Sequence, residues 1–232
     1  MAASLAPLRR VLTPRLSGIS PTQHIALTYD DGPDPATTPA FLKLLSRHDV
    51  RATFFLVGEH AWANPRLVKQ IAAEGHELGV HGWTHRCVPL QTPGRLTTEL
   101  RRTRHLLTLP GGREVTWYRP PYGILTTEAL VAAGANGLTP VLWSAWGWDW
   151  SARATPTRIV RTIDRTLRPG GTVLLHDTDR ESTPGSWLNT LAASEHLLTA
   201  WQRHRLAVGP LGEHWDLHPV APTARSVGST PA

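Results

Sequence analysis

The chain has 232 residues and a mass of 25.5 kDa, enough for one large domain with a sizeable core. Hydrophobic residues make up 41% of it and charged residues 18%, which excludes both a disordered polar chain and a protein of continuous apolar segments. A single cysteine excludes a fold held by intramolecular disulfides. The net charge is +6, but the arginines are scattered, so we predict an ordinary basic surface and no nucleic-acid partner.

The two ends of the chain differ in composition from the rest. Residues 1–22 mix arginine, proline and serine with short apolar pieces, none as long as a signal-peptide core. We therefore expect a flexible N-terminal segment and a cytoplasmic location. Residues 213–232 are rich in small residues and proline and predict a disordered tail. Between them, residues 23–212 contain no repeat or linker and predict a single domain, without the ~18 apolar residues of a membrane span.

Short runs of strand-forming residues alternate with helical patterns along this domain. The expected strands cover residues 25–29, 52–57, 76–80, 115–119, 137–143 and 172–176, with a seventh candidate at 206–211. The expected helices cover residues 38–47, 65–74, 97–107, 126–133, 156–167 and 187–204. This alternation is typical of βα units around a parallel sheet. About seven such units predict an α/β fold of the distorted (β/α) barrel type, similar to a TIM barrel.

Chemically active residues follow five of the expected strands. They are the segments 30–33 (DDGP), 81–85 (HGWTH), 119–123 (RPPYG), 149–150 (DW) and 176–177 (HD). In (β/α) barrels the reactive side chains lie at the carboxyl ends of the strands, so we expect these segments to surround one site. Each segment alone has a plain structural explanation, such as an Asx turn, a rigid proline turn or a hydrogen-bonded core pair. Together they favour a functional site.

His81 and His85 suggest a metal. Two imidazoles four residues apart on a helical turn face the same way and can bind one cation. In isolation, a pair of hydrogen-bonded surface histidines explains this spacing equally well. The metal interpretation gains weight from the carboxylates expected on the same face.

These segments stand in the order of five motifs of a known family. Residues 28–35 (TYDDGPDP) resemble the motif T-F-D-D-G-P, and residues 81–85 resemble H-[ST]-x-x-H. Further along, RPPYG resembles R-x-P-[YF], WDW the end of D-x-x-D-W, and LLHD the motif L-x-H-D. The chain thus resembles the polysaccharide deacetylase family, which is carbohydrate esterase family 4 and has the NodB homology domain. The resemblance implies a distorted (β/α) barrel, a divalent metal and hydrolysis of an N-acetyl group on an amino sugar.

The resemblance implies that Asp31, His81 and His85 hold the metal. A set of two histidines and one carboxylate leaves coordination positions for water and substrate. We expect zinc, with cobalt, nickel or manganese as alternatives. A metal in this position would acidify a water molecule and polarise the acetyl carbonyl.

The resemblance also implies catalytic roles. Asp30 would be the general base, held ionised by a charge-assisted contact with Arg119. The backbone N–H at Tyr122 would stabilise the oxyanion. His176 would be the general acid, with Asp149 raising its pKa and fixing its tautomer.

The implied substrate-binding residues are Trp150 and Leu175, which would wall the pocket for the acetyl methyl group, together with Pro121 and Trp146. Two positions depart from the family motifs. Gly82 stands where a Ser or Thr is usual, so a hydroxyl that would brace the metal loop is absent. Trp146 stands where the fourth motif usually begins with Asp, which suggests a remodelled wall of the cleft.

The sequence therefore predicts a metal-dependent hydrolase that removes N-acetyl groups from an N-acetylhexosamine-containing oligosaccharide or glycan, of the chitooligosaccharide or peptidoglycan type. One alternative is an intracellular deacetylase or amidase that acts on a small acetylated metabolite. Another is a catalytically silent carbohydrate-binding domain. The expected partner is the N-acetylated sugar itself, and no obligate protein partner is evident.

Overall fold

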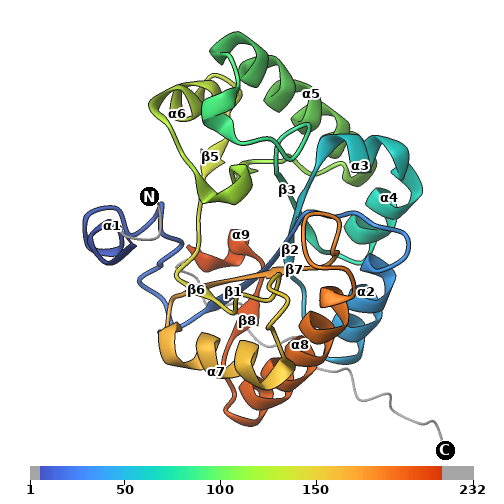
Figure 1. Cartoon of the computed structure of the whole chain (residues 1–232), viewed down its shortest axis with the longest axis vertical. Coiled ribbons are helices and arrows are strands. Elements are labelled where there is room, and N and C mark those ends of the chain that lie inside the picture. Colours follow the sequence, from blue (N-terminus) through green and yellow to red (C-terminus); the bar gives the residue numbers. More distant parts are fainter. Residues whose placement is uncertain (1–5, 216–232) are drawn as a thin grey trace, which may run out of the picture.

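A computed structural model of the chain describes residues 6–215 (Figure 1). Its strands are β1 (Ile25–Asp30), β2 (Thr53–Leu56), β3 (Glu77–Val80), β4 (Trp117–Tyr118), β5 (Thr139–Pro140), β6 (Ala145–Trp146), β7 (Thr172–His176) and β8 (Val208–Gly209). All pairings are parallel, in the order β5-β4-β3-β2-β1-β7-β6, and β8 pairs with the start of β1. Because β5 and β6 are the two ends of this order, the barrel is open between them. The predicted distorted (β/α) barrel is confirmed.

Helices surround the sheet. They are α1 (Ala6–Leu12), α2 (Thr38–Arg47), α3 (Gly58–Ala63), α4 (Pro65–Ala73), α5 (Pro93–Gly111), α6 (Thr127–Gly134), α7 (Pro156–Thr166), α8 (Ser186–Arg203) and α9 (Leu211–His214). Local sequence fixes several of their starts. Before α7, the hydroxyl of Thr155 accepts a hydrogen bond from the Arg158 N–H, and Pro156 occupies the first turn. No helix within residues 6–215 has the length and apolarity needed to cross a bilayer.

The central strands are buried on both faces. Every residue of β1 and β2 is buried, as expected for parallel strands covered by helices. Successive side chains of β1 nevertheless point to opposite faces of the sheet. Tyr29 packs against Phe41 of α2 at 5.2 Å between ring centroids, whereas Thr28 and Asp30 face the barrel interior and contact Arg119. The register of β1 therefore places the Asp30 carboxylate inside the barrel at the carboxyl end of the strand.

The strand expected at residues 137–143 is divided in the structure. Only Thr139 and Pro140 pair with β4, and the chain then crosses to β6, which pairs with β7. The Leu142 N–H donates instead to the backbone oxygen of Leu16, 2.8 Å away, so this residue leaves the sheet. The segment between β5 and β6 thereby bridges the open side of the barrel.

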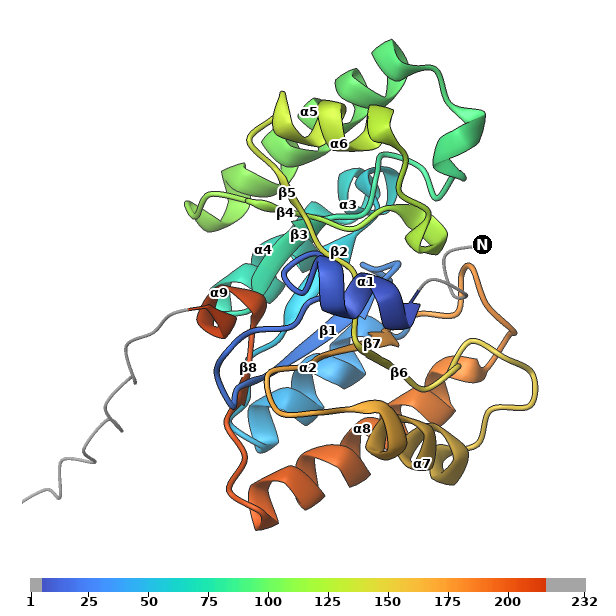
Figure 2. The ribbon, with the colours of Figure 1, turned by 90° about the vertical axis from the view of Figure 1, so that its left-hand side faces the viewer.

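The prediction of a flexible segment over residues 1–22 is wrong for the part that the structure describes. Helix α1 and the turns after it lie against the bridging segment, as Figure 2 shows from the side. Besides the Leu16 contact, Arg9 donates to the backbone oxygen of Trp143. The strand and helix patterns of the sequence did not reveal this packing, because it depends on hydrogen bonds to residues more than a hundred positions away. Residues 1–5 lie outside the described part.

The expected boundary of the C-terminal tail at residue 213 is also too early. Helix α9 runs to His214, which is fully buried, and the ring of Trp215 packs on Trp117 at 5.3 Å. Residues 211–215 are therefore part of the fold. The remainder of the predicted tail, residues 216–232, lies outside the described residues.

Candidate active site

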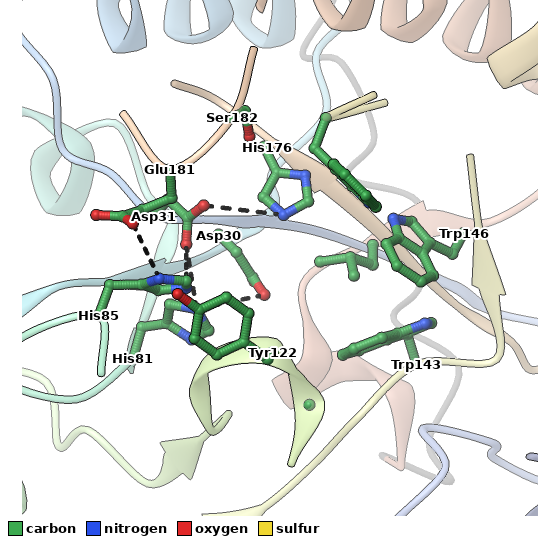
Figure 3. Close-up of a pocket in the computed structure, with 13 residues that line it drawn as sticks. Asp30, Asp31, His81, His85, Tyr122, Trp143, Trp146, His176, Glu181 and Ser182 are labelled. Carbon is green, nitrogen blue, oxygen red and sulfur yellow. Dashed lines mark ion pairs between the residues drawn. The ribbon is translucent and has the colours of Figure 1, made fainter. Parts of the chain in front are cut away.

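Three potential metal ligands meet at the carboxyl ends of β1 and β3 (Figure 3). Asp31 directly follows β1, His81 directly follows β3, and His85 lies in the same loop as His81. One ligand atom from each lies within 4.8 Å of the others. The Asp31 Oδ1 atom is 3.2 Å from Nε2 of His81 and 3.3 Å from Nε2 of His85.

The chemistry of these donors fits a divalent cation. One carboxylate and two imidazoles form a common ligand set for zinc and similar metals. The Asp31 Oδ1 atom is buried yet accepts no well-directed hydrogen bond, an unusual state for a carboxylate oxygen in a protein interior. The His81 Nδ1–H donates to the backbone oxygen of Arg119 at 2.8 Å, which leaves Nε2 available as a ligand. Asp31, His81 and His85 would therefore hold the ion.

Two of the three donors, Asp31 and His85, have pKa shifts that agree with this role. Burial alone would lower the pKa of His81, but Asp30 and Asp31 raise it. Burial alone would raise the pKa of Asp31, but His81 and the other nearby imidazoles hold it well below its usual range. Burial lowers the pKa of His85 to about 4. A metal ligand must be an ionised carboxylate or a neutral imidazole, and both groups are in these forms at neutral pH.

The loop that carries both histidines is not helical, so the helical turn expected from their spacing is wrong. It bends at Gly82, whose φ of 90° lies in the left-handed region that favours glycine. The backbone oxygen of Gly82 accepts hydrogen bonds from the Gly58 N–H and, more weakly, from the hydroxyl of Thr103. The Glu59 N–H donates to Trp83 in the same way. The start of α3 thus braces the loop, although the hydroxyl expected at position 82 is missing.

Asp30 lies beside the metal ligands and is held by Arg119. Its Oδ1 accepts from Nη1 of Arg119 at 2.7 Å, and its Oδ2 lies 4.0 Å from Nε2 of His81. The contact is single, because the other guanidinium N–H groups donate to Thr28 and to backbone oxygens, including that of Leu142. Arg119 also has no exposed surface and lies over the Phe55 ring. Asp30 is consequently fixed, with one carboxylate oxygen free of the arginine.

His176 forms the opposite part of the site. Its Nδ1 lies 3.1 Å from Oδ1 of the fully buried Asp149, and its backbone N–H donates to Oδ2 of the same carboxylate at 2.8 Å. The hydroxyl of Thr190 also donates to that oxygen. Burial alone would lower the pKa of His176, but Asp149 reverses this effect and raises it. His176 is therefore an imidazolium, and its Nε2–H points away from Asp149.

A cavity of about 250 Å³ joins these groups. It is lined by Asp30, Asp31, His81, His85, Tyr122, Gly123, Trp143, Trp146, Trp150, Leu174, His176, Glu181 and Ser182. Figure 3 shows the three potential metal ligands and the two indoles Trp143 and Trp146 on opposite sides, with Asp30 between them. Arg119 and Asp149 lie behind the lining and contact it through Asp30 and His176.

Two of the predicted substrate-binding residues do not line this cavity. Leu175 is fully buried in the main hydrophobic core, and Leu174 takes the expected place beside His176. Side chains alternate along a strand, so Leu174 and His176 share a face of β7 whereas Leu175 points to the other. Pro121 is buried in the turn before Tyr122 and does not reach the cavity.

Glu181 is a lining residue that the sequence did not indicate. Its Oε2 lies 3.3 Å from Nδ1 of the potential ligand His85, although the angle is not that of a good hydrogen bond. A carboxylate on the outer nitrogen of a ligand histidine can orient the ring. Glu181 lies in a loop after β7, outside every recognisable motif, so only the folded chain brings it to His85.

Comparisons with known proteins place this geometry in context. The family model described as polysaccharide deacetylase matches residues 17–141. A chitooligosaccharide deacetylase of Bradyrhizobium sp. is 36% identical over 203 residues, which cover 83% of this chain and 91% of that protein. The crystal structure of the Bc1960 peptidoglycan N-acetylglucosamine deacetylase has a TM-score of 0.76 at 32% identity, with 86% of this chain and 91% of that chain covered. A pseudoenzyme of the CE4 family from Bacillus anthracis gives a TM-score of 0.74 at 26% identity, with coverage of 84% and 66%.

Proposed function

Because the chain belongs to the polysaccharide deacetylase family, we propose that it hydrolyses the N-acetyl group of an N-acetylhexosamine unit in an oligosaccharide or glycan. One observation carries this proposal. A carboxylate held by a buried arginine and an imidazole held by a buried aspartate face one cavity, beside three donors for a divalent metal. The relatives named for chitooligosaccharide and peptidoglycan deacetylation support the same substrate class.

The donor set of Asp31, His81 and His85 supports zinc as the ion. When bound there, a divalent cation would polarise the acetyl carbonyl and lower the pKa of a water molecule. Its ligands come from two strand ends that other contacts already fix, so the chain holds the donors close together before the ion binds.

Asp30 supplies the base. It takes a proton from the water whose oxygen attacks the acetyl carbon, using the carboxylate oxygen that Arg119 leaves free. The hydrogen bond from Arg119 fixes the direction of the free oxygen of Asp30. The backbone N–H at Tyr122 is the proposed donor to the oxyanion.

His176 supplies the acid. As the bond between the acetyl carbon and the nitrogen breaks, Nε2 of His176 gives its proton to the departing amine, and acetate remains. Asp149 accepts a hydrogen bond from the Nδ1–H of His176. The other proton of the ring is therefore on Nε2, the nitrogen that faces the departing amine. Trp150 and Leu174 offer an apolar wall for the acetyl methyl group.

The CE4 pseudoenzyme shows that likeness of fold does not guarantee turnover, so the silent carbohydrate-binding domain needs a direct test. The assay is acetate release from chitooligosaccharides, peptidoglycan fragments and small N-acetyl amino sugars, each with zinc, cobalt, nickel or manganese added. The His176→Ala variant serves as the matched inactive protein. Release by the wild type that falls strongly in this variant supports the proposal, and preferred turnover of the small sugars would favour the metabolite alternative. Absence of release with every substrate and metal would contradict the proposal.

A further inference from the structure

A second hollow, of about 220 Å³, adjoins the catalytic cavity. The two share the lining residues Tyr122, Gly123, Trp143 and Trp146, so they lie side by side. The second hollow is otherwise lined by Trp148, by Arg9 and Arg10, and by the hydroxyl residues Ser144, Thr162 and Thr166. No Asp or Glu of the described residues lines it. A ligand that spans both hollows would meet the acid-base groups at one end and two arginines at the other.

The two arginines are held in place by neutral partners. Arg9 donates from Nε to the Ser17 hydroxyl at 3.1 Å and from Nη2 to the backbone oxygen of Trp143 at 3.1 Å. Arg10 donates from Nη2 to the backbone oxygen of Ser144. Its Nε is buried and has no partner. Within residues 6–215, neither arginine forms an ion pair with a carboxylate.

Unpaired, partly buried cations are unfavourable. Burial and the neighbouring charge of Arg10 both disfavour the charged form of Arg9 and so lower its pKa. A guanidinium removed from water requires a counter-charge or further acceptors to offset its lost hydration. An anion in the second hollow would supply both, since guanidinium groups bind carboxylate and phosphate oxygens through several N–H donors.

The rest of the wall suits a sugar ring. Trp146 and Trp148 stack with ring centroids 4.3 Å apart and planes at 18°, and Trp143 meets Trp146 edge to face. The Trp148 side chain is about half exposed, at 48%, so part of this aromatic surface is open to a ligand. Indole faces bind the C–H faces of sugars. The hollow therefore combines an aromatic platform with two cations.

We propose that the second hollow is a subsite for a sugar residue that carries a carboxylate or a phosphate, adjacent to the N-acetyl sugar that is deacetylated. The position of that N-acetyl sugar rests on the proposed function. Arg9 and Arg10 precede residues 17–141, which match the family model, so the subsite depends on the N-terminal segment of this chain.

The test compares three disaccharides that differ in charge. They are neutral N,N′-diacetylchitobiose, its 1-phosphate, and N-acetylglucosaminyl-N-acetylmuramic acid, which carries a lactyl carboxylate. Calorimetric titration of the zinc-loaded Asp30→Asn protein gives each dissociation constant without turnover. We expect one or both acidic ligands to bind about tenfold more tightly than chitobiose at low ionic strength. The acidic ligand that binds more tightly than chitobiose shows whether the subsite recognises a carboxylate or a phosphate.

Adding Arg9→Gln and Arg10→Gln should remove this preference, so that the acidic ligands bind no more tightly than chitobiose to the same variant. Arg153→Gln is the matched control, because Arg153 is exposed, lines neither hollow and changes the net charge by the same amount per substitution. Equal affinity for all three ligands, or a preference that survives the double substitution, would overturn the subsite. If circular dichroism shows that the double variant is unfolded, Arg10→Gln alone and the salt dependence of the wild-type preference decide, since salt weakens exposed ionic contacts.

Failure of the proposed function would look different. Acetate release from neutral chitobiose by the wild-type protein tests the chemistry apart from recognition of an acidic group. Release without any acidic preference in binding would refute the subsite alone. An acidic preference that the arginines control, without release from any substrate, would refute the deacetylase and support the subsite.

Discussion

Arg119 has no exposed surface and stabilises a buried carboxylate, so the energetics of the site depend strongly on this one residue. It joins Asp30 to the barrel interior through the Thr28 hydroxyl and the backbone of the segment between β5 and β6. Removal of one partner of a buried ion pair leaves the other charge uncompensated, which is much worse than removal of both. The pair should therefore be strongly coupled in stability as well as in catalysis.

Arg119→Leu should lower the free energy of unfolding by about 3–5 kcal/mol, because Asp30 is then buried without its cation. Asp30→Asn in the same background should restore part of this loss, since the isolated charge is gone. Urea unfolding of the wild type, both single variants and the double variant measures the coupling. Effects that add within about 0.5 kcal/mol would show that the two groups are energetically independent.

Individual side chains show where sequence reasoning succeeds. Asp30 and His176 were identifiable because each ends a strand within a recognisable motif. Leu174 could have been identified as well, since it lies two residues before His176 and must share its face. Glu181 and Arg10 could not have been identified from the sequence. Their roles depend on how a loop after β7 and a segment before β1 return to the site, and no local pattern encodes that path.

Among the elements, the loop from His81 to His85 determines how the two proposed histidine ligands are spaced. Its backbone reverses at Gly82, where an added Cβ would lie 3.0 Å from the backbone oxygen of Thr84. A side chain at position 82 would be strained by the unfavourable φ and would crowd this oxygen. A backbone movement that relieved the strain or the crowding would displace the histidines.

Gly82→Ser should therefore weaken zinc binding and lower the free energy of unfolding by about 1–3 kcal/mol, although it restores the hydroxyl residue usual in the family. The matched control is Gly112→Ser. Gly112 also has a positive φ, of 61°, but an added Cβ there meets nothing within 4 Å. Calorimetric zinc titration and urea unfolding of both variants separate the two effects. Unchanged zinc affinity in Gly82→Ser would show that the loop tolerates a side chain.

Element boundaries were less predictable than element types. The helix at 38–47 and the strand at 172–176 agree with the sequence because their patterns end at clear breaks. The apolar run at 137–143 contains no such break. It divides into β5 and a bridging segment because Leu142 bonds to Leu16, and this competition between partners exists only in the folded chain.

Across the whole molecule, buried neutral histidines far from the catalytic cavity make the fold sensitive to acid. His76 accepts a hydrogen bond from the Ala52 N–H through Nδ1, and His24 and His214 share one between their Nδ1 atoms at 3.1 Å. Burial lowers the pKa of His24 and of His76 to about 4, and it also lowers that of His214. An imidazolium cannot accept, so protonation breaks these contacts.

Stability should therefore fall as the pH drops from about 6.5 toward 4, because the unfolded chain binds these protons first. Well above pH 6.5 these imidazoles are neutral in both the folded and the unfolded chain, so they no longer make stability depend on pH. Urea unfolding at pH 7 and pH 4.5 measures the change. The His76→Gln variant keeps a hydrogen-bond acceptor that does not titrate. Its free energy of unfolding should therefore decrease less between pH 7 and pH 4.5 than that of the wild type, by about 1–2 kcal/mol. Equal losses would assign the acid sensitivity to other groups.

The proposed catalysis requires two adjacent aspartates to have different roles, Asp31 as metal ligand and Asp30 as general base. The most direct test is acetate release from a chitooligosaccharide by zinc-loaded wild type and Asp30→Asn, with the zinc content of each protein measured in the same preparation. We expect equal zinc per chain in both and a rate about 10²- to 10⁴-fold lower in the variant, the usual loss when a general base is removed. Loss of zinc from Asp30→Asn, or a rate near that of the wild type, would contradict the assignment.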